Sequence, residues 1–580
     1  MFKNRNPGIK QTSNPEEVIK NIMEQRHGDL KAFLNPTTNI HVENLDNAAE
    51  KIKEAIKNNE KITIVGDYDC DGVCATSIMK NTLDSLGADV DIRLPMRFSE
   101  GYGLSKKIID EINEGLILTV DNGIVAFDAI EKAKDKGLDV IVTDHHLPLK
   151  EEGETLFPEA DIIVDAAAEK KSSFHDFCGA SIAYLLSSKL TKDQTLNKDN
   201  LVLASIATIG DVMPLIGPNR VIVQSGLRLI NQGYGGPVIQ ALKSKMYIDE
   251  HCNEEDYGFK LCPCINAAGR LYDNGATLVT SAIINADTAS SWQIADKLIS
   301  LNEKRKDLVK HIMETYVDTE NIDRTKPVCI YVPAIETTLD NGKKGEIISS
   351  EGLIGIVAGK ICEEYHTPCV CFTDGENGEL KGSARSIEEI HLKNALDKLK
   401  DNDYLVRYGG HAGAAGLTIK KDKQEEFIND FTVACGAIPE KSTDMQYDAV
   451  IDSSQCKQAI DIAQKYGPYG EGNEKLVFLV NCKTKADQYA QIGDGSHFII
   501  RADDLTLMGF GLTKKYEEAD KPLDFMAIGA LNYNWYKGKA TPQMNVMDFE
   551  PAKVLEKTSV KEQEAEPIPK KQEILDEIVL

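Results

Sequence analysis

The chain has 580 residues of ordinary globular composition, 42% hydrophobic and 27% charged, which predicts three or four domains of about 150 residues each. Its 92 acidic residues outnumber its 66 basic ones by 26, which excludes general affinity for nucleic acid and allows only a local basic lining. There is no signal peptide and no apolar run near 18 residues, and the thirteen cysteines are odd in number and scattered. We therefore expect free thiols and a cytoplasmic protein.

The hydrophobic pattern predicts two α/β domains joined by a long helix, with a small β-barrel after them. The first domain is expected to hold a parallel sheet, and the barrel to be of the oligonucleotide-binding (OB) kind. The predicted segments are an N-terminal arm over 1–45, the first α/β domain over 46–284, the connecting helix over 285–320, the second α/β domain over 321–440, the barrel over 441–554 and a mobile tail over 555–580.

A stretch of acids in the first domain carries the strongest signal. A β-branched strand over 61–65 is followed by Asp67, Asp69 and Asp71 at alternate positions, and the apolar pattern of a helix comes next. In an extended segment alternate side chains point the same way, so these carboxylates are expected to converge. Converging carboxylates repel unless a cation lies between them, and oxygen ligands suit Mg²⁺ or Mn²⁺.

The pattern repeats along the domain. Apolar segments over 115–120, 139–143 and 201–209 end at Asp121, at Asp144-His145-His146 and at Asp211. Because the carboxyl ends of parallel strands meet at one sheet edge, the four segments are expected to bring these groups together.

Such a set of ligands could hold two divalent ions about 3.5–4 Å apart and hydrolyse a phosphate ester by in-line attack. The imidazole of His145 shifts the preference from Mg²⁺ toward Mn²⁺. His146 could contact the phosphate or the attacking water, and the alternative is a pair of loop histidines bonded to backbone.

Other interpretations of these motifs stay open. The aspartate stretch also fits a solvated acidic turn, or the start of a calcium loop, although the twelfth position, Ile78, is not the required glutamate. Cys262-Pro-Cys264 and Cys369-Val-Cys371 lack the spacing of a zinc ribbon.

Two segments of the second domain could bind phosphate. Glycines surround His411 and would let backbone amides approach an anion, although a tight turn with an incidental histidine fits equally. Ser383 and Arg385 offer a hydroxyl and a guanidinium that suit a terminal phosphate, and the alternative is a solvated basic loop.

Several motifs together resemble the DHH phosphoesterase superfamily, and within it the RecJ family of bacterial single-strand-specific 5′→3′ DNA exonucleases. The superfamily motifs are Asp67–Gly72, Val120–Gly123, Thr143–His146 and Gly210–Leu215. The narrower ones are Met96–Gly103, Asn266–Arg270, Gly382–Ser386, Gly409–Ala412, Tyr469–Asn473 and Asn534–Gly538. The resemblance covers roughly residues 45–550.

The resemblance implies a role for each matching residue. Asp69 and Asp71 would each serve one of two Mn²⁺ ions, with Mg²⁺ as the alternative ion. Asp121 would bridge them, and His145 and Asp211 would complete the second site. Supporting roles fall to further residues: Asp67 would assist, Asp144 would orient a neighbouring ligand, His146 and His411 would contact the scissile phosphate, Arg97, Ser383 and Arg385 would hold the 5′ phosphate, and Asn266 and Arg270 would line the substrate path.

Two positions depart from the family pattern. Some relatives carry a histidine where this chain has Val65, so one ion would be held more weakly or take an extra water. The segment Val164-Asp165-Ala166-Ala167 stands in place of the usual Asn-Pro. Neither change is expected to remove activity.

The resemblance therefore implies a monomeric, Mn²⁺-dependent exonuclease that releases 5′-mononucleotides from single-stranded DNA in repair and recombination. A single-stranded-DNA-binding protein or a helicase would be its protein partner, and Tyr533, Trp535 and Tyr536 would stack bases unless they are core residues. One alternative is a phosphodiesterase of short oligoribonucleotides, which would lack the barrel. Another is an inactive DHH scaffold that binds single strands in a replication complex, which would have lost metal ligands.

Overall fold

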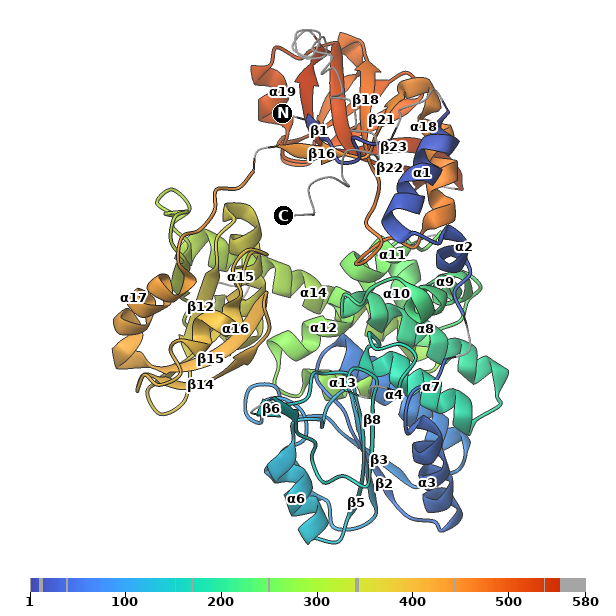
Figure 1. Cartoon of the computed structure of the whole chain (residues 1–580), viewed down its shortest axis with the longest axis vertical. Helices are drawn as coiled ribbons and strands as arrows, with labels where there is room; N and C mark the ends of the chain where they lie inside the picture. Colours follow the sequence, from blue (N-terminus) through green and yellow to red (C-terminus); the bar gives the residue numbers. More distant parts are fainter. Residues whose placement is uncertain are drawn as a thin grey trace, which may run out of the picture. The chain divides into compact units, whose positions relative to one another are not determined.

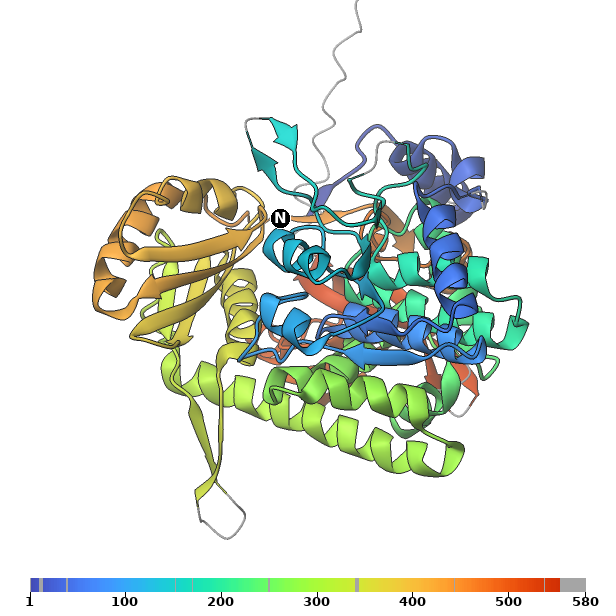
Figure 2. The ribbon, with the colours of Figure 1, turned by 90° about the horizontal axis from the view of Figure 1, so that it is seen from below.

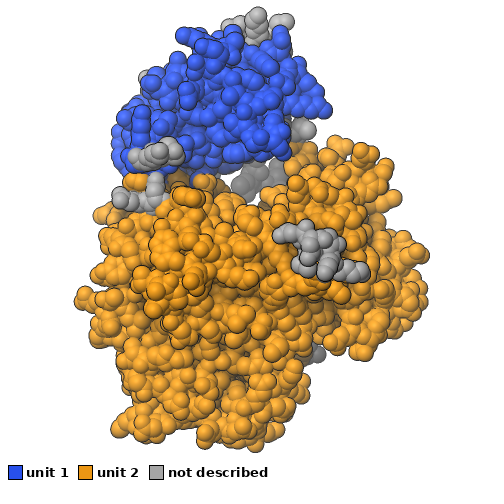
Figure 3. Space-filling model, turned by 180° about the vertical axis from the view of Figure 1, so that it is seen from behind, with its two compact units in different colours: residues 1–30, 443–466, 475–580 blue, residues 31–442, 467–474 orange. Residues whose placement is uncertain are grey.

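The computed structural model describes residues 2–9, 14–37, 40–151, 153–168, 171–248, 251–338, 344–442, 444–536 and 538–552. The predicted tail over 555–580 lies outside the described residues. The chain forms two compact units, which Figure 3 colours separately. Unit 1 comprises residues 1–30, 443–466 and 475–580, and unit 2 comprises residues 31–442 and 467–474.

Unit 2 begins with the parallel sheet that the sequence predicts. Its strand order is β3-β2-β4-β5-β8, and every neighbouring pair runs parallel. The strands are β2 (Ile62–Val65), β3 (Val90–Arg93), β4 (Leu116–Val120), β5 (Asp139–Asp144) and β8 (Ile162–Asp165). A short antiparallel hairpin, β6 (Lys150–Glu151) with β7 (Glu154–Thr155), lies between β5 and β8.

Helices cover both faces of this sheet because its strands are apolar on both sides. Alternate strand residues such as Ile64 and Leu118 pack with α3 (Leu45–Lys57), α4 (Cys70–Ser85) and α7 (Gly179–Leu190). The residues between them, such as Ile117 and Val142, pack with α5 (Lys106–Glu111) and α6 (Phe127–Asp135) on the other face. Figure 1 shows α3 and α6 on opposite sides of the strands.

A helical part follows the sheet, and it corrects one prediction. The apolar run 201–209 belongs to a helix rather than to a further strand, so Asp211 follows a helix end. An apolar run of this length fits a buried helix as well as a strand, and the Asp193 side chain caps this helix by accepting from Thr195 N and Leu196 N. The helices are α8 (Gln194–Gly210), α9 (Gly217–Ile230), α10 (Gly236–Lys245), α11 (Glu254–Asp256), a π-helical turn (Tyr257–Leu261), α12 (Cys262–Leu271), α13 (Gly275–Asn285) and α14 (Thr288–Tyr316).

The connecting helix leads into a second α/β domain of unit 2. Figure 2 shows α14 as one long continuous helix. The second sheet has the order β14-β15-β13-β12-β9, with α15 packed on β12 and β13, and with α16 and α17 around a separate aromatic core that includes Phe427 and Phe431. Its elements are β9 (Val328–Tyr331), β10 (Ile335–Thr338), β11 (Lys344–Ile348), α15 (Glu351–Tyr365), β12 (Cys369–Asp374), β13 (Glu379–Arg385), α16 (Leu392–Asp397), β14 (Leu405–Gly410), β15 (Ala414–Lys420) and α17 (Gln424–Cys435).

Unit 1 is built on a seven-stranded sheet of order β17-β18-β22-β23-β21-β20-β19. No pairing among the described residues closes this sheet into the predicted barrel, although the predicted fold class of two α/β domains and a β-rich C-terminal domain is confirmed. The strands of the sheet are β17 (Ala449–Asp452), β18 (Val477–Lys483), β19 (Tyr489–Ile492), β20 (His497–Ala502), β21 (Leu505–Gly509), β22 (Asp524–Tyr536) and β23 (Lys539–Pro551). The same unit contains β16 (Met445–Tyr447), which lies outside this sheet, and the helices α18 (Cys456–Ala463) and α19 (Thr513–Glu518).

The start of the chain folds with the C-terminal residues in unit 1. The sequence pattern does not predict this association. Strand β1 (Phe2–Asn4) pairs in parallel with β16, and α1 (Pro15–His27) packs on α18. The short helix α2 (Leu30–Leu34) begins unit 2. Among the described residues, none of the helices combines the length and the apolar character that a membrane crossing requires.

A buried ion pair fixes this association and can be tested. Asp448 is fully buried, with Arg26 NH2 2.8 Å from its Oδ1 and Val477 N donating to its Oδ2 at 2.9 Å. Replacing Arg26 by methionine leaves the carboxylate without its nearest cation, so we expect unit 1 to lose about 3 kcal/mol of stability in calorimetric unfolding. Arg5→Met is the matched control, because Arg5 is half-exposed and 3.6 Å away, and it should cost less than about 1 kcal/mol. Equal small effects would contradict the assignment.

Candidate active site

The predicted acids and imidazoles converge at one edge of the parallel sheet. Asp67, Asp69 and Asp71 follow β2, Asp121 follows β4, and His145 and His146 follow β5. Asp211 reaches the same place from the C-terminal end of α8. Ligand atoms lie within 4.8 Å of one another in three overlapping groups: Asp67–Asp69–Asp121, Asp71–His145–Asp211 and Asp121–His145–His146.

His145 lies at the centre of the cluster. Its Nε2 is 3.1 Å from Asp121 Oδ1 and 3.6 Å from both Asp71 Oδ2 and Asp211 Oδ2. Burial lowers the pKa of His145, although the nearby Asp71 charge acts in the opposite direction. A neutral imidazole with carboxylates on three sides has the chemistry of a metal ligand.

Three carboxylate oxygens of the cluster lack a hydrogen-bond partner in the described part of the chain. Asp67 Oδ1, Asp121 Oδ1 and Asp211 Oδ2 are buried and accept no hydrogen bond within the described residues. Buried polar atoms are normally paired, so three orphaned carboxylate oxygens in one cluster need an explanation. Carboxylate oxygens with one imidazole are the donor set that Mg²⁺ and Mn²⁺ accept, and the residues therefore fit a divalent cation.

The electrostatics of the carboxylate cluster also favour a bound cation. Burial, followed by the charges of neighbouring aspartates, raises the pKa of Asp67 and of Asp121 well above the ordinary range. The same causes raise the pKa of Asp211 to about 8. These acids therefore resist ionisation without a cation, and a bound cation would release their protons.

Two acids receive backbone support that the sequence pattern does not reveal. Asp69 caps α4 and accepts from Asp71 N at 2.9 Å and Gly72 N at 3.1 Å. Asp71 in turn accepts from Gly179 N at 2.6 Å and Ala180 N at 2.8 Å, at the N-terminus of α7. A helix N-terminus favours negative charge, and this one holds the Asp71 carboxylate toward the cluster.

Asp144 contacts the ring of His146 and the backbone of His145. Its Oδ1 lies 2.8 Å from His146 Nδ1 and accepts from His145 N at 2.8 Å, while its Oδ2 accepts from Ile124 N at 2.9 Å. Burial alone would raise the pKa of Asp144, but the bond and charge of His146 outweigh it and lower that pKa. Burial would lower the pKa of His146, and the bond to Asp144 overcomes this and raises it to about 9. His146 is therefore a cation beside the carboxylates.

Tyr102 and Asn122 also belong to the site, although the sequence analysis gives neither a role. Both stand inside motifs that carry the family resemblance, which is the signal that could have found them. The Tyr102 hydroxyl donates to the Asp121 carbonyl at 2.9 Å and lies 3.1 Å from His146 Nδ1. The buried Asn122 amide donates to the carbonyls of Val65 and Val120, and thereby joins the ends of β2 and β4.

Basic residues lie beside the cluster. The Arg97 guanidinium is 4.3 Å from the centre of the Tyr68 ring. Burial, and then the charge of Arg97, lowers the pKa of Arg270 to about 9, and Arg270 NH1 donates to the Gly352 carbonyl at 3.3 Å. Asn266 precedes Arg270 by four residues, about one turn of α12.

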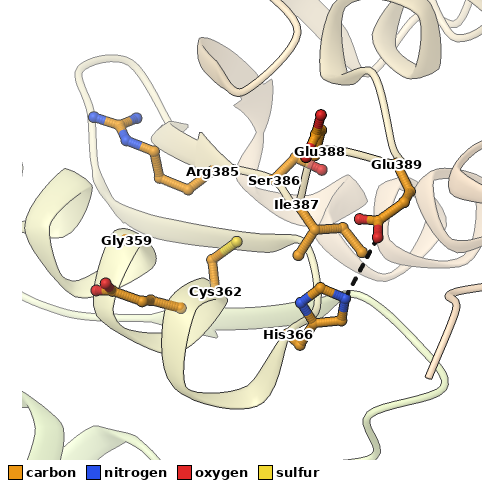
Figure 4. A pocket seen from close by; sticks show the side chains of 9 residues that line it. Gly359, Cys362, His366, Arg385, Ser386, Ile387, Glu388 and Glu389 are labelled. Carbon is orange, nitrogen blue, oxygen red and sulfur yellow. Dashed lines mark ion pairs between the residues drawn. The ribbon is translucent and has the colours of Figure 1, made fainter. Parts of the chain in front are cut away.

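Ser383 and Arg385 lie on β13 under α15. Arg385 NH1 donates to the Ala384 carbonyl at 2.8 Å and to Ser383 Oγ at 3.4 Å. Arg385 borders a pocket of about 480 Å³, which Figure 4 shows with Gly359 and Cys362 of α15. A Cβ at Gly355 would lie 2.9 Å from Ser383 Oγ, so glycine is what lets this helix approach the strand so closely.

Other predicted residues lie outside the cluster. His411 is exposed between β14 and β15, and within the described residues no hydrogen bond or ion pair joins it to the carboxylates. Val65 is a buried core residue. Asp165, from the segment that departs from the family pattern, pairs with Asp144 across β8 and β5 and accepts from Ala167 N at 2.9 Å. In unit 1, the Tyr533 hydroxyl donates to Asp461 at 2.6 Å and its ring meets Trp535 edge-on, while the Tyr536 side chain lies outside the described part.

Family models match three parts of the chain. The N-terminal domain of the DHH family matches residues 61–209, the DHHA1 domain matches 344–436, and the RecJ OB domain matches 447–548. The first match includes the sheet edge with Asp67–Asp71, Asp121, His145 and His146 but ends two residues before Asp211, and the second match includes the strand with Ser383 and Arg385. Fold and site together therefore define a DHH-family protein.

Individual relatives narrow the family. The single-stranded-DNA-specific exonuclease RecJ of Salmonella typhimurium is 32% identical over 467 residues, which span 74% of this chain and 76% of that protein. RecJ of Bacillus subtilis is 30% identical over 523 residues, or 86% of this chain and 62% of that protein. A crystal structure of Thermus thermophilus RecJ in complex with Mn²⁺ aligns with a TM-score of 0.74 at 25% identity, covering 92% of this chain and 76% of that one. The chain belongs to the RecJ family.

The close contact between α7 and Asp121 can be tested at Gly179. A Cβ at this position would lie 2.5 Å from Asp121 Cβ, so Gly179→Ala must displace either the carboxylate or the helix end that holds Asp71. We expect Mn²⁺ affinity to fall about 10- to 100-fold in isothermal titration calorimetry, the usual cost of disturbing residues that support metal ligands. Gly8→Ala, where a Cβ meets open space, should bind as the wild type does. Equal affinities for both variants would refute the contact.

The raised carboxyl pKa values predict how the metal-free protein responds to pH. Because Asp67, Asp121 and Asp211 hold protons in the folded state at pH values where they are ionised in the unfolded state, their contribution to stability is greatest at low pH and decreases as pH rises toward about 8. Thermal unfolding of the protein, measured with a chelator present to remove divalent ions, should show this decrease. Asp211→Asn should reduce the slope of stability against pH. A slope that is the same in the variant would mean that Asp211 is not involved.

Proposed function

We propose that the protein is a single-stranded-DNA-specific 5′→3′ exonuclease that hydrolyses phosphodiester bonds and releases 5′-mononucleotides in DNA repair and recombination. One observation carries the proposal: Asp67, Asp71, Asp121, His145 and Asp211 meet at one sheet edge, and three of these carboxylates keep a buried oxygen that a divalent cation would satisfy. The RecJ relatives, which are described as single-stranded-DNA-specific exonucleases, supply the substrate class.

Divalent cations are the cofactor, and two Mn²⁺ ions fit the ligands best, with Mg²⁺ as the alternative. Structures of Thermus thermophilus RecJ are described with Mn²⁺ and with Mg²⁺. In this chain Asp121 belongs to two of the three ligand groups and is the natural bridge between two ions. Bound ions would polarise the scissile phosphate and lower the pKa of the attacking water.

The remaining side chains bind and orient the strand. His146, which contacts Asp144 and Tyr102, would contact the scissile phosphate, and His411 of the second domain would be a further phosphate contact. Arg97, Ser383 and Arg385 hold the 5′ phosphate through two guanidinium groups and a hydroxyl, and Asn266 and Arg270 line the path of the strand. In unit 1, Tyr533 and Trp535 offer rings for base stacking.

The alternatives predicted from sequence find less support. An inactive scaffold has no need of metal ligands, and this chain keeps every acid of the cluster together with His145. A phosphodiesterase of short oligoribonucleotides has no need of the OB domain that the family model matches over residues 447–548.

Digestion of a 5′-labelled single strand with Mn²⁺ tests the proposal. Wild-type protein should release labelled mononucleotides and leave a duplex of the same sequence intact. Asp121→Ala should abolish release with little loss of folding, because removing one buried carboxylate also relieves repulsion in the metal-free site. Tight binding without cleavage by the wild type would favour the scaffold, and wild-type rates from Asp121→Ala would end the bridging assignment.

A further inference from the structure

The strand that carries Ser383 and Arg385 presents a third functional side chain on the same side. Residues two apart on a β-strand point the same way, so Lys381, Ser383 and Arg385 share one side of β13. Neither the family resemblance nor the proposed function gives Lys381 a role. Its side chain is three-quarters buried, which is unusual for a lysine and calls for an explanation.

The ammonium group of Lys381 is fully engaged. Its Nζ lies 2.9 and 2.8 Å from the two oxygens of Glu351 and donates to the Phe98 carbonyl at 3.1 Å. An ammonium has three hydrogens, and these three acceptors use all of them. Lys381 therefore has no donor left for a phosphate, and its charge is balanced by Glu351.

The Phe98 carbonyl belongs to the residue after Arg97, in a loop that is held from two sides. Asp273, which follows α12, accepts from Phe98 N at 2.7 Å and from Ser99 Oγ at 2.7 Å. Arg97 N donates to the Asp273 carbonyl at 3.2 Å. Lys381 adds the one hydrogen bond among these that reaches the loop from the second sheet.

Lys381 thus connects the two halves of the predicted 5′-phosphate site. One half is Arg97, on a loop of the first domain, and the other is Ser383 with Arg385, on β13 of the second. A site assembled from two domains binds a phosphate more tightly when the distance between its halves is fixed before binding, because less ordering is then needed. The bond from Lys381 to the peptide next to Arg97 fixes that distance.

We propose that Lys381 is a positioning residue that aligns Arg97 with Ser383 and Arg385 and thereby sets the preference for 5′-phosphorylated ends. The proposal deepens the proposed function and rests on it. Glu351 is the second member of this clamp, because its carboxylate neutralises and orients the ammonium.

Lys381→Met tests the proposal, since it keeps the aliphatic stem and removes the donors. The measurement is kcat/KM on one oligonucleotide with a 5′-phosphate and with a 5′-hydroxyl, and the ratio of the two is the preference. We expect this ratio to fall on the order of tenfold, the equivalent of one charge-assisted hydrogen bond. The rate on 5′-hydroxyl ends and the Mn²⁺ concentration for half-maximal activity should stay at wild-type values.

Control variants distinguish a loss of alignment between Arg97 and β13 from a general loss of activity. Lys421→Met removes another lysine of the second domain, paired with Asp374 at 2.6 Å on the surface, and should leave the ratio unchanged. Lys381→Arg should restore part of the preference. Arg385→Ala gives the ratio expected when a direct phosphate contact is lost.

Glu351→Gln distinguishes positioning from direct binding and serves also if Lys381→Met does not fold. A positioning role predicts a lower preference, because the clamp loosens. If Lys381 binds the phosphate itself, freeing it from Glu351 would raise the preference, which would overturn the proposal. The proposal would also be overturned if Lys381→Met left the 5′-phosphate preference unchanged, or if it lowered kcat/KM equally on 5′-phosphate and 5′-hydroxyl ends. A wild type that degrades single strands without any 5′ preference would defeat this inference alone, whereas a wild type that degrades none would defeat the proposed function.

Discussion

Repulsion between buried carboxylates is the constraint on which this structure depends. The edge of the parallel sheet brings five aspartates into one small volume, and three of them carry an oxygen that no group of the described chain satisfies. Such a cluster is stable only if the acids stay protonated or a cation enters. The fold therefore keeps a site whose charge balance is completed from outside the chain.

Two kinds of group balance the charge of these carboxylates. Backbone N–H groups at the N-termini of α4 and α7 satisfy Asp69 and Asp71, so these two acids are held without a cation. Asp67, Asp121 and Asp211 each keep a buried oxygen without a hydrogen-bond partner in the described chain. Helix ends thus fix the geometry of the site. The negative charge of the remaining carboxylates is available to bind metal ions, which catalysis of phosphate transfer by metals would require.

Much of this arrangement could be predicted from sequence. Strands of a parallel sheet end at the same edge, and the end of each apolar run shows which residues form the loop at that edge. That logic placed Asp67 through Asp71, Asp121 and His145 correctly. It failed for the run before Asp211, because an apolar stretch buried on all sides has no period that separates a helix from a strand. The convergence survived, since a helix C-terminus can reach the same edge.

Other features depend on contacts between residues distant in sequence, which no local pattern encodes. Gly179 supports Asp71 across 108 positions, and its lack of a side chain matters only because Asp121 packs against it. Lys381 meets Phe98 across 283 positions. Pairing of β1 with β16 likewise joins residues 2–4 to residues 445–447. These contacts come from tertiary packing, and only the folded structure reveals them.

Diffraction at the manganese absorption edge tests the central claim most directly, with crystals of the wild-type protein grown in Mn²⁺. The account predicts two anomalous peaks at the sheet edge, both within coordination distance of Asp121 and one of them also of His145. A map with no peak among these residues, while manganese binds elsewhere or not at all, would contradict it.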